Sequence, residues 1–164
     1  MKKLLLPGFL AFALLLSASC THKLKEVKFV PQIKEYTMLI AGDSSTFKDS
    51  VRDRIIEKYR PTCEIHVINI KDLPNVDASL YDVVVIMDTC MAWSGFNPSF
   101  KTFLDKDGNK NKTVLSMTAG NPSWKYSYNN VDAITSASRV DKQDSFFVRI
   151  DDGIQEIMSL DRMD

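Results

Sequence analysis

The stretch that most constrains the fold is Asp82–Leu104, DVVVIMDTCMAWSGFNPSFKTFL. It begins with Val83–Met87, a continuously apolar run rich in β-branched residues. Such a run is typical of a strand covered on both faces, as in a parallel sheet with helices on both sides. The loop Thr89–Phe96 follows, with no charged residue but with an indole, a thioether, a phenyl ring and a glycine. Because open α/β sheets bind ligands at the carboxyl ends of their strands, this loop predicts a site for a flat, aromatic ligand.

Residues 1–19 have the pattern of a secretory signal peptide, with a basic start, an apolar run and small residues before Cys20. The apolar run is about 13 residues long, short of the roughly 20 that span a bilayer. The sequence LLSASC resembles a bacterial lipobox, which implies that cleavage makes Cys20 the first residue and that this cysteine carries lipid. The mature chain would then be anchored on the extracytoplasmic side of the bacterial cell envelope. The alternative is a plain secreted chain with an unrelated cysteine.

Composition narrows the classes of function. The chain has 164 residues, of which 45% are hydrophobic and 26% charged, and this fits one globular domain. Removal of residues 1–19 takes two lysines and no acidic residue from a chain of zero net charge, so the mature chain carries −2. This charge gives no electrostatic basis for binding nucleic acid. With two histidines and no CxxC or HExxH motif, a metal site is not expected.

Residues 20–35 are rich in lysine, and we interpret them as a tether that lifts the domain at 36–164 from the membrane. Val27–Val30 is a candidate for a short flap on that domain. The lysines of the tether are either simply solvated or in contact with anionic lipid headgroups; they are Lys23, Lys25, Lys28 and Lys34.

Alternation of apolar and polar residues predicts the order of elements after the tether. Strands are expected at Tyr36–Ala41, Glu64–Ile70, Val83–Met87, Thr113–Thr118 and Ala133–Ser138, the second of them at a sheet edge. Helices are expected after 43–46, after the N-cap Asn97, and on the apolar series Phe147, Ile150, Ile154 and Ile157. Only 13 residues, 120–132, separate the last two strands, so the fourth helix should be short. The pattern predicts a three-layer, doubly wound α/β fold with a five-stranded parallel sheet.

Several residues of types that often serve in catalysis or metal binding are explained by structural roles. His66 falls on a predicted strand with no carboxylate partner suggested nearby, so we interpret it as a strand residue. Cys63 starts one strand and Cys90 follows another, which argues against a disulfide between them. Asp88 ends a buried strand and is expected to cap a turn. Residues 105–111, DKDGNKN, lack the glycine spacing of a calcium loop and are interpreted as a polar turn.

The segment TCMAWSGFNPSFKTFLD, residues 89–105, resembles the flavodoxin and flavodoxin-like quinone-reductase superfamily. The family segment T-P-T-Y-W-G-N-M-P-x-Q-M-K-x-F-L-D aligns with it without a gap. The identical positions are Thr89, Trp93, Lys101, Phe103, Leu104 and Asp105. Further on, KTVLSMTAGNPS is similar to the family's fourth strand and following loop. The resemblance covers residues 36–164.

This resemblance implies a site for flavin mononucleotide (FMN), built from three loops at the carboxyl ends of the strands. A helix N-terminus with nearby hydroxyl groups would bind the phosphate, and the candidates are Ser44, Ser45 and Thr46. The isoalloxazine ring would lie among Thr89, Met91, Trp93, Ser94, Gly95, Phe96, Gly120 and Trp124. The flavin would supply the redox chemistry, so no acid or base catalyst is expected.

The first loop departs from the family pattern T-x-T-G-N-T. It reads DSSTFK, contains no glycine, and places Asp43 beside the expected phosphate, with Lys48 as the residue that offsets this charge. Helix capping also explains the same serines without any ligand.

The sequence is consistent with two functions. One is a membrane-anchored protein that binds FMN for electron transfer to a redox partner or for reduction of a quinone-like acceptor. The other is a flavin-free lipoprotein of the same fold that acts as a binding or interaction module.

Overall fold

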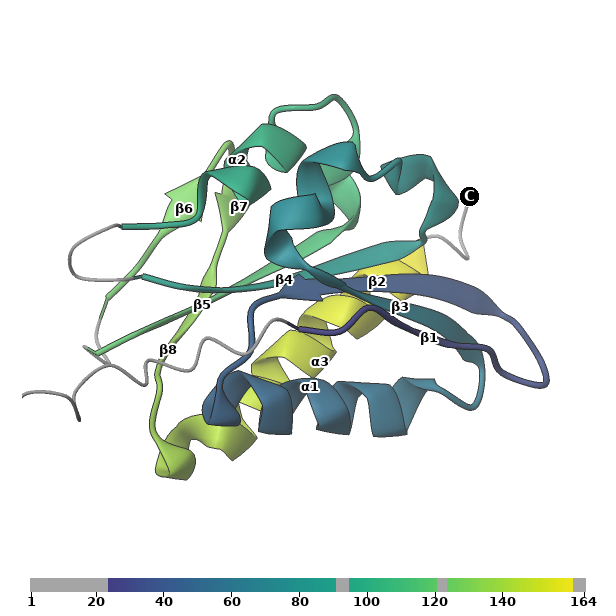
Figure 1. Ribbon diagram of the computed structural model, residues 1–164, viewed down its shortest axis with the longest axis horizontal. Coiled ribbons are helices and arrows are strands. Elements are labelled where there is room, and N and C mark those ends of the chain that lie inside the picture. The colour runs from purple at the N-terminus through teal and green to yellow at the C-terminus, as the bar shows by residue number, and fades with distance from the viewer. Residues whose placement is uncertain (1–23, 91–94, 121–123, 161–164) are drawn as a thin grey trace, which may run out of the picture.

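A six-stranded sheet runs through the middle of the computed structural model, which describes residues 24–90, 95–120 and 124–160 (Figure 1). Its strands are β1 (Val27–Phe29), β2 (Tyr36–Gly42), β3 (Cys63–Asn69), β4 (Val83–Thr89), β5 (Thr113–Ala119) and β8 (Ile134–Ala137). The order across the sheet is β1-β3-β2-β4-β5-β8; β1 is antiparallel to β3, and every other pair is parallel. The five parallel strands therefore have the 2-1-3-4-5 order of a flavodoxin-like sheet.

Helices cover both faces of the sheet, as apolar parallel strands require. α1 (Thr46–Tyr59) and α3 (Gln143–Leu160) lie on one face, below the sheet in Figure 1, and α2 (Pro98–Leu104) lies on the other. The 3₁₀ helices η1 (Ile70–Asn75) and η2 (Ala78–Leu80) share the face of α2. The predicted three-layer, doubly wound α/β fold is confirmed.

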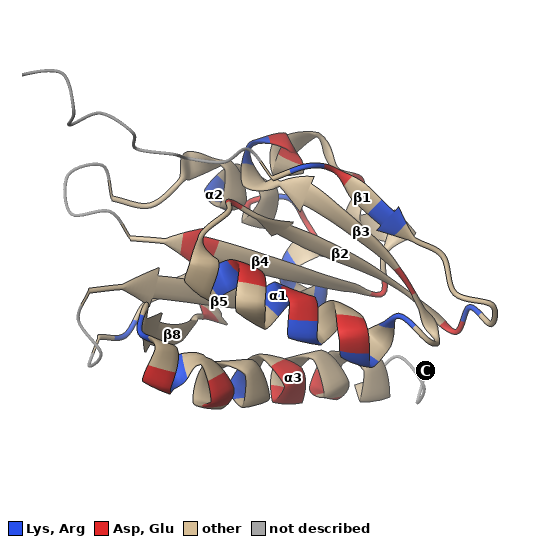
Figure 2. Cartoon of the chain, turned by 60° about the horizontal axis from the view of Figure 1, so that its bottom comes forward, with Lys and Arg blue, Asp and Glu red and all other residues tan. Residues whose placement is uncertain are grey.

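Each face of the sheet has its own apolar core. Val83 and Val85 of β4 belong to the core beneath α1 and α3, whereas Val84 and Ile86 belong to the core beneath α2. All four residues are fully buried. Since full burial of an aliphatic side chain contributes about 1.5–3 kcal/mol, this short run stabilises both layers. Figure 2 shows that charged residues line the outer surfaces of α1 and α3, while the strands between the layers carry few.

The predicted helix starts are confirmed by their hydrogen bonds. The Ser45 side chain caps α1 by accepting from the backbone N–H of Lys48 at 3.3 Å. The Asn97 side chain caps α2 by accepting from the N–H of Ser99 at 2.9 Å. The carboxylate of Asp88 accepts from the N–H of Asn97 at 3.0 Å, so Asp88 caps a turn as expected. Each bond satisfies an N–H that has no partner within its helix.

α3 packs closely against β5. Its fully or nearly buried apolar residues are Phe146, Ile150, Ile154 and Met158, while Phe147 and Ile157 of the predicted series are only partly buried. A Cβ at Gly153 would lie 3.4 Å from both γ-carbons of Val114. Glycine at this position therefore serves close packing of the helix on the sheet, although it lowers helix propensity.

The sheet has one strand more than the five predicted. β1 pairs with β3 from Val27 opposite Val67 to Phe29 opposite Ile65, so β3 is not the edge strand that its alternating pattern predicted. Leu24 and Phe29 also pack against the core beneath α1. Part of the stretch interpreted as a tether is therefore attached to the domain.

Glu64 is the centre of a polar cluster that attaches this first strand. Its carboxylate lies 2.9 Å from the Lys28 ammonium, 3.4 Å from that of Lys34 and 3.1 Å from Nε2 of His66. Nδ1 of His66 lies 2.9 Å from the Tyr81 hydroxyl. The expectation that His66 has no carboxylate partner was wrong, because Glu64 is two residues away on the same face of the strand. The Lys28 ammonium, with His66 and Lys34, lowers the pKa of Glu64 to about 2.

Replacing Glu64 with glutamine should loosen β1. The backbone amides of residues 27–29 that bond to β3 should exchange with solvent faster in Glu64→Gln than in the wild type at neutral pH, because both lysines lose their partner. A carboxylate with a lowered pKa stabilises the fold above its unfolded value of about 4.3 and loses this effect as the pH falls toward its folded value. Acidification from about pH 5 to 2 should therefore increase opening of β1 in the wild type but hardly in the variant, after correction for intrinsic exchange. Glu57→Gln, at an exposed position of α1, is the control. Unchanged exchange in Glu64→Gln would contradict the role of this cluster.

Two crossover connections are short, and the second of them was predicted to be so from its 13 residues. Between β3 and β4 the chain uses η1 and η2 instead of an α-helix. Between β5 and β8 the described residues form a hairpin, β6 (Ser127–Tyr128) and β7 (Val131–Asp132), where a short helix was expected. Asn129 and Asn130 at its turn have φ values of 51° and 64°. Positive φ at both central positions is what a type I′ turn needs, and asparagine tolerates it.

Cys63 and Cys90 are free, which confirms the expectation that they form no disulfide. Cys63 is fully buried, and this burial, with the nearby Asp82 carboxylate, raises the pKa of its thiol to about 12. An unfolded thiol ionises near about 8.5, so the free energy of unfolding should fall as the pH rises from about 9 toward 12. In urea titrations Cys63→Ala should show a shallower alkaline decline than the wild type. An identical slope would contradict this assignment.

Other predictions concern ions and membranes. The polar turn after α2 leads into η3 (Asn109–Lys112), and no group of acidic, histidine or cysteine residues in the described segments has the arrangement of a metal site. Within the same described segments, no helix is long and apolar enough to cross a bilayer. The predicted signal peptide and Cys20 lie outside the described residues.

Candidate functional site

The carboxyl ends of β2 and β4 lie side by side where the strand order changes direction. β2 has β3 on one side and β4 on the other, and open α/β sheets bind ligands at such a switch point. Gly42 ends β2 close to β4, because a Cβ on it would lie 3.1 Å from the carbonyl oxygen of Met87. The turn that follows Gly42 therefore starts directly beside the end of β4.

The three hydroxyl residues of this turn are used by the start of α1. Ser45 is its N-cap, as described above, and the Ser44 hydroxyl donates to the Asp49 carboxylate at 2.7 Å. Thr46 is the first residue of the helix and is exposed. The capping explanation is confirmed for Ser45. Asp49 in the first turn also balances the positive end of the helix dipole.

Lys48 is the most unusual residue of the site, since its side chain is only 2% exposed. Its ammonium forms an ion pair with Asp43 and donates to the Thr89 hydroxyl at 2.7 Å. The Thr89 hydroxyl lies 2.9 Å from that of Thr118 on β5. Lys48 therefore offsets Asp43, as expected from the sequence, and also links the start of α1 to the ends of β4 and β5. A buried ammonium needs such partners because losing water without them is costly.

The first loop does not fit the phosphate of FMN. The Asp43 carboxylate already supplies the negative charge that Lys48 and the start of α1 attract. At an effective dielectric constant of 20, like unit charges 4 Å apart repel by roughly 4 kcal/mol. A phosphate dianion beside Asp43 would meet about twice this repulsion, and the single charge of Lys48 is shared between them.

Aromatic residues form a cluster on the α2 side of the site. The rings of Phe96 and Trp124 are stacked with centroids 5.8 Å apart, and Tyr126 lies 4.1 Å from Phe96. Phe100 of α2 contacts Phe96, Tyr126 and Tyr128 edge to face. Two of the predicted walls for a flavin ring, Phe96 and Trp124, thus pack on each other. The two rings therefore pack against each other and do not form two walls with space for a flavin ring between them.

Trp124 completes this cluster. Its Nε1 is buried and has no hydrogen-bond partner among the described residues, while its carbonyl accepts from the Thr135 hydroxyl at 2.7 Å. Its ring stacks on Phe96 and also contacts Tyr126.

A hollow of about 260 Å³ remains at the carboxyl edge. It is lined by Asp43, Asp88, Thr89, Gly95, Phe96, Asn97 and Pro98. Burial raises the pKa of Asp88, the N–H of Asn97 lowers it, and Asp43 adds to the rise. The hollow is slightly below the roughly 300–1,000 Å³ of usual small-molecule pockets, and its carboxylates disfavour an anion.

The structure brings together only part of the predicted site. Thr89, Gly95 and Phe96 line one hollow, and Ser44, Ser45 and Thr46 lie at the start of α1 beside it. Trp124 belongs to the aromatic cluster, and Gly120, just after β5, is exposed. Met91, Trp93 and Ser94 lie outside the described residues. Thr118 was not among the site residues predicted from the sequence. It could have been found from its place at the end of a predicted strand, because it lies opposite Thr89 at the end of the neighbouring strand.

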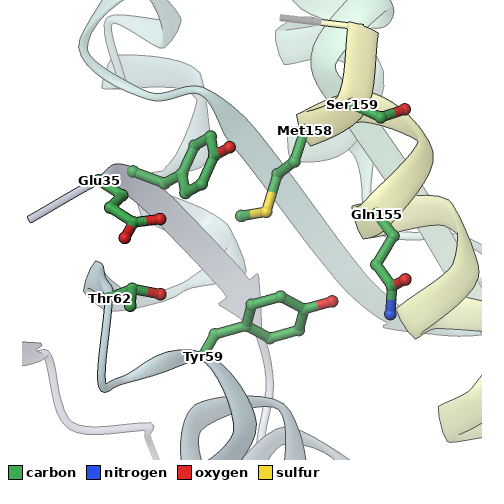
Figure 3. Close-up of a pocket in the computed structure, with 7 residues that line it drawn as sticks. Glu35, Tyr59, Thr62, Gln155, Met158 and Ser159 are labelled. Atoms are coloured by element: carbon green, nitrogen blue, oxygen red, sulfur yellow. The ribbon is translucent and has the colours of Figure 1, made fainter. Parts of the chain in front are cut away.

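A second hollow, of about 350 Å³, lies at the amino edge of the sheet (Figure 3). Figure 3 shows Met158 reaching from α3 toward Glu35 and Tyr59. Beside it, the Asp151 carboxylate accepts from the Tyr59 hydroxyl at 2.8 Å and lies 2.6 Å from the Lys58 ammonium. Burial and Asp151 raise the pKa of Tyr59. This hollow is at the opposite edge from the ligand sites of open α/β sheets, and its polar groups stabilise the packing of α1 on α3.

Comparisons with known proteins were made by sequence and by structure. No family model matches the chain, and no curated protein matches it. Among solved structures, it is similar to oxidised flavodoxin 1 from Bacillus cereus, with 13% sequence identity and a TM-score of 0.39. The match covers 73% of this chain and 97% of that chain. The fold is assigned from the strand order of the sheet. A function has to be inferred from the residues of the site itself.

Proposed function

We propose that this chain is a membrane-anchored lipoprotein whose flavodoxin-like domain acts as a binding module without FMN. The proposal places the mature chain on the extracytoplasmic side of the cell envelope, attached through lipid on Cys20. Support for export comes from the signal-like residues 1–19 and the LLSASC sequence. Support for flavin-free binding comes from the geometry at the carboxyl edge.

The observation that carries the flavin-free proposal is the buried ion pair of Lys48 with Asp43. It puts a carboxylate where the resemblance expects a phosphate, and Thr89 completes the set of partners. The stacking of Phe96 on Trp124 is an independent second observation. FMN would have to displace the carboxylate and separate the stacked rings, and each change has a cost in free energy.

FMN-dependent electron transfer, or reduction of a quinone-like acceptor, is the second candidate. It is favoured by the position of the site at the switch point and by the aromatic residues beside it. If FMN binds, Trp93→Ala should weaken binding about 5- to 150-fold, which corresponds to loss of roughly 1–3 kcal/mol of stacking. An unchanged affinity would mean that the flavin ring does not stack on Trp93.

Two analyses of the protein purified from bacterial membranes test the proposal. Mass spectrometry of the intact chain should show that it begins at Cys20 and carries acyl groups, and Cys20→Ser should abolish both acylation and firm membrane attachment. Extraction of the native protein should yield no stoichiometric flavin. An unmodified N-terminus would refute the anchor, and one FMN per chain would refute flavin-free binding in favour of the second candidate.

A further inference from the structure

The direction of β1 determines how the chain enters the domain. β1 is antiparallel to β3, with Val27 opposite Val67, two residues before the end of β3. Leu24, the first described residue, already packs against the core beneath α1 and shares a hollow with Arg52 and Ile56 of that helix. The chain is therefore held at the β1 side of the domain from Leu24 onward.

Chain length then restricts where an anchor on Cys20 can lie. Four residues of extended chain span at most about 14 Å, so Cys20 remains within that distance of Leu24. The far side of the sheet is at β8, five strand spacings of about 4.8 Å, or roughly 24 Å, from β1. A lipid attached to Cys20 can thus hold the β1 side at a bilayer, whereas the β8 side points away from it.

The other end of β1 carries exposed apolar residues between basic ones. Val30 is 69% exposed and Ile33 is 68% exposed in the loop that leads to β2. Lys28 and Lys34 flank them, and each of these side chains is 52% exposed. Apolar side chains at the centre and lysines at the margin are the arrangement with which peripheral segments enter the headgroup region of a bilayer.

We propose that the β1 side of the domain lies on the bilayer, with the lipid anchor near one end of β1 and the Val30–Ile33 loop inserted at the other. The inference rests on the proposed lipid attachment at Cys20 and names the bilayer as the partner of this surface. Lys28 and Lys34 remain with Glu64, which keeps the loop attached to the sheet, and their exposed parts face the headgroups. Two attachments fix the orientation of the domain, which a flexible tether would leave free.

Two exposed valines provide a matched test. Val30 follows β1, and Val140, 81% exposed, begins η4 (Val140–Lys142) after β8, the strand at the opposite edge of the sheet. Each is replaced by cysteine in a Cys90→Ser background and labelled with an environment-sensitive fluorophore, since Cys63 is buried. The lipidated full chain is then reconstituted in vesicles of phosphatidylethanolamine and phosphatidylglycerol that contain a lipid-phase quencher. The probe at position 30 should be quenched several-fold more than the probe at position 140.

The outcomes separate this inference from the proposed anchor. Equal quenching at both positions, or stronger quenching at 140, in a chain shown by mass to be lipidated would overturn the orientation alone. If the chain proves not to be lipidated, both the anchor and this inference fail. A second measurement uses the Cys20→Ser chain without lipid, which should bind the same vesicles weakly, and Val30→Ser/Ile33→Ser should reduce that binding about tenfold or more. Unchanged binding by this double variant would also overturn insertion of the loop.

Discussion

Asp43→Asn should destabilise the protein by about 2 kcal/mol, although the side chain it changes is half exposed. The reason is that Lys48, which is 2% exposed, loses its carboxylate and remains a buried charge. Removal of one partner from a fully buried pair costs about 3–5 kcal/mol, and the access of water to Asp43 reduces this figure. The measurement is the free energy of unfolding in urea at neutral pH.

Inorganic phosphate should restore part of the stability that Asp43→Asn loses. If Asp43 takes the place of an anionic ligand, inorganic phosphate should stabilise Asp43→Asn by about 1.4 kcal/mol once its concentration reaches ten times the dissociation constant. The wild type should not respond. The control is Asp43→Asn/Lys48→Met, which removes the ammonium and should be both more stable than the single variant and insensitive to phosphate. Equal responses to phosphate in all three proteins would mean that the pair does not occupy an anion site.

Phe100→Ala should cost about 3–5 kcal/mol, the largest effect expected for any single change at the site. Phe100 is completely buried on α2 and contacts Phe96, Tyr126 and Tyr128 edge to face. Its removal leaves a cavity under the whole aromatic cluster, so the near-ultraviolet circular dichroism of the folded variant should also weaken. Val148→Ala, at a half-exposed position on α3, should change stability by no more than about 0.5 kcal/mol. A loss below about 1 kcal/mol in Phe100→Ala would contradict the packing described for the cluster.

Much of the fold could be predicted because its signals are local. The apolar run Val83–Met87 predicts a central parallel strand, and Asn97 with Pro98 marks the start of α2 from residue types alone. The pairing of β1 with β3 could not be predicted in this way. It depends on contacts such as that of Lys28 with Glu64, far apart in the sequence, and three residues are too few for a clear strand pattern.

The candidate site was predicted less well than the fold, for a physical reason. The sequence places Lys48, Asp43 and Thr89 at the correct edge of the sheet, but it does not show that one buried ammonium joins the other two. In the same way, aromatic residues after two strands serve equally well as walls for a ligand or as partners for each other. Phe96 and Trp124 take the second arrangement, which only their spatial positions reveal.

Titration of the mature chain with FMN tests the central claim most directly. The chain from residue 20, with Cys20 replaced by serine, is added to FMN while flavin fluorescence and visible absorption are followed, and flavodoxin serves as the positive control. We expect no quenching and no spectral shift up to high micromolar protein, because Asp43 and Lys48 are already paired and Phe96 lies on Trp124. Saturable quenching at one FMN per chain with a submicromolar dissociation constant would contradict the flavin-free account.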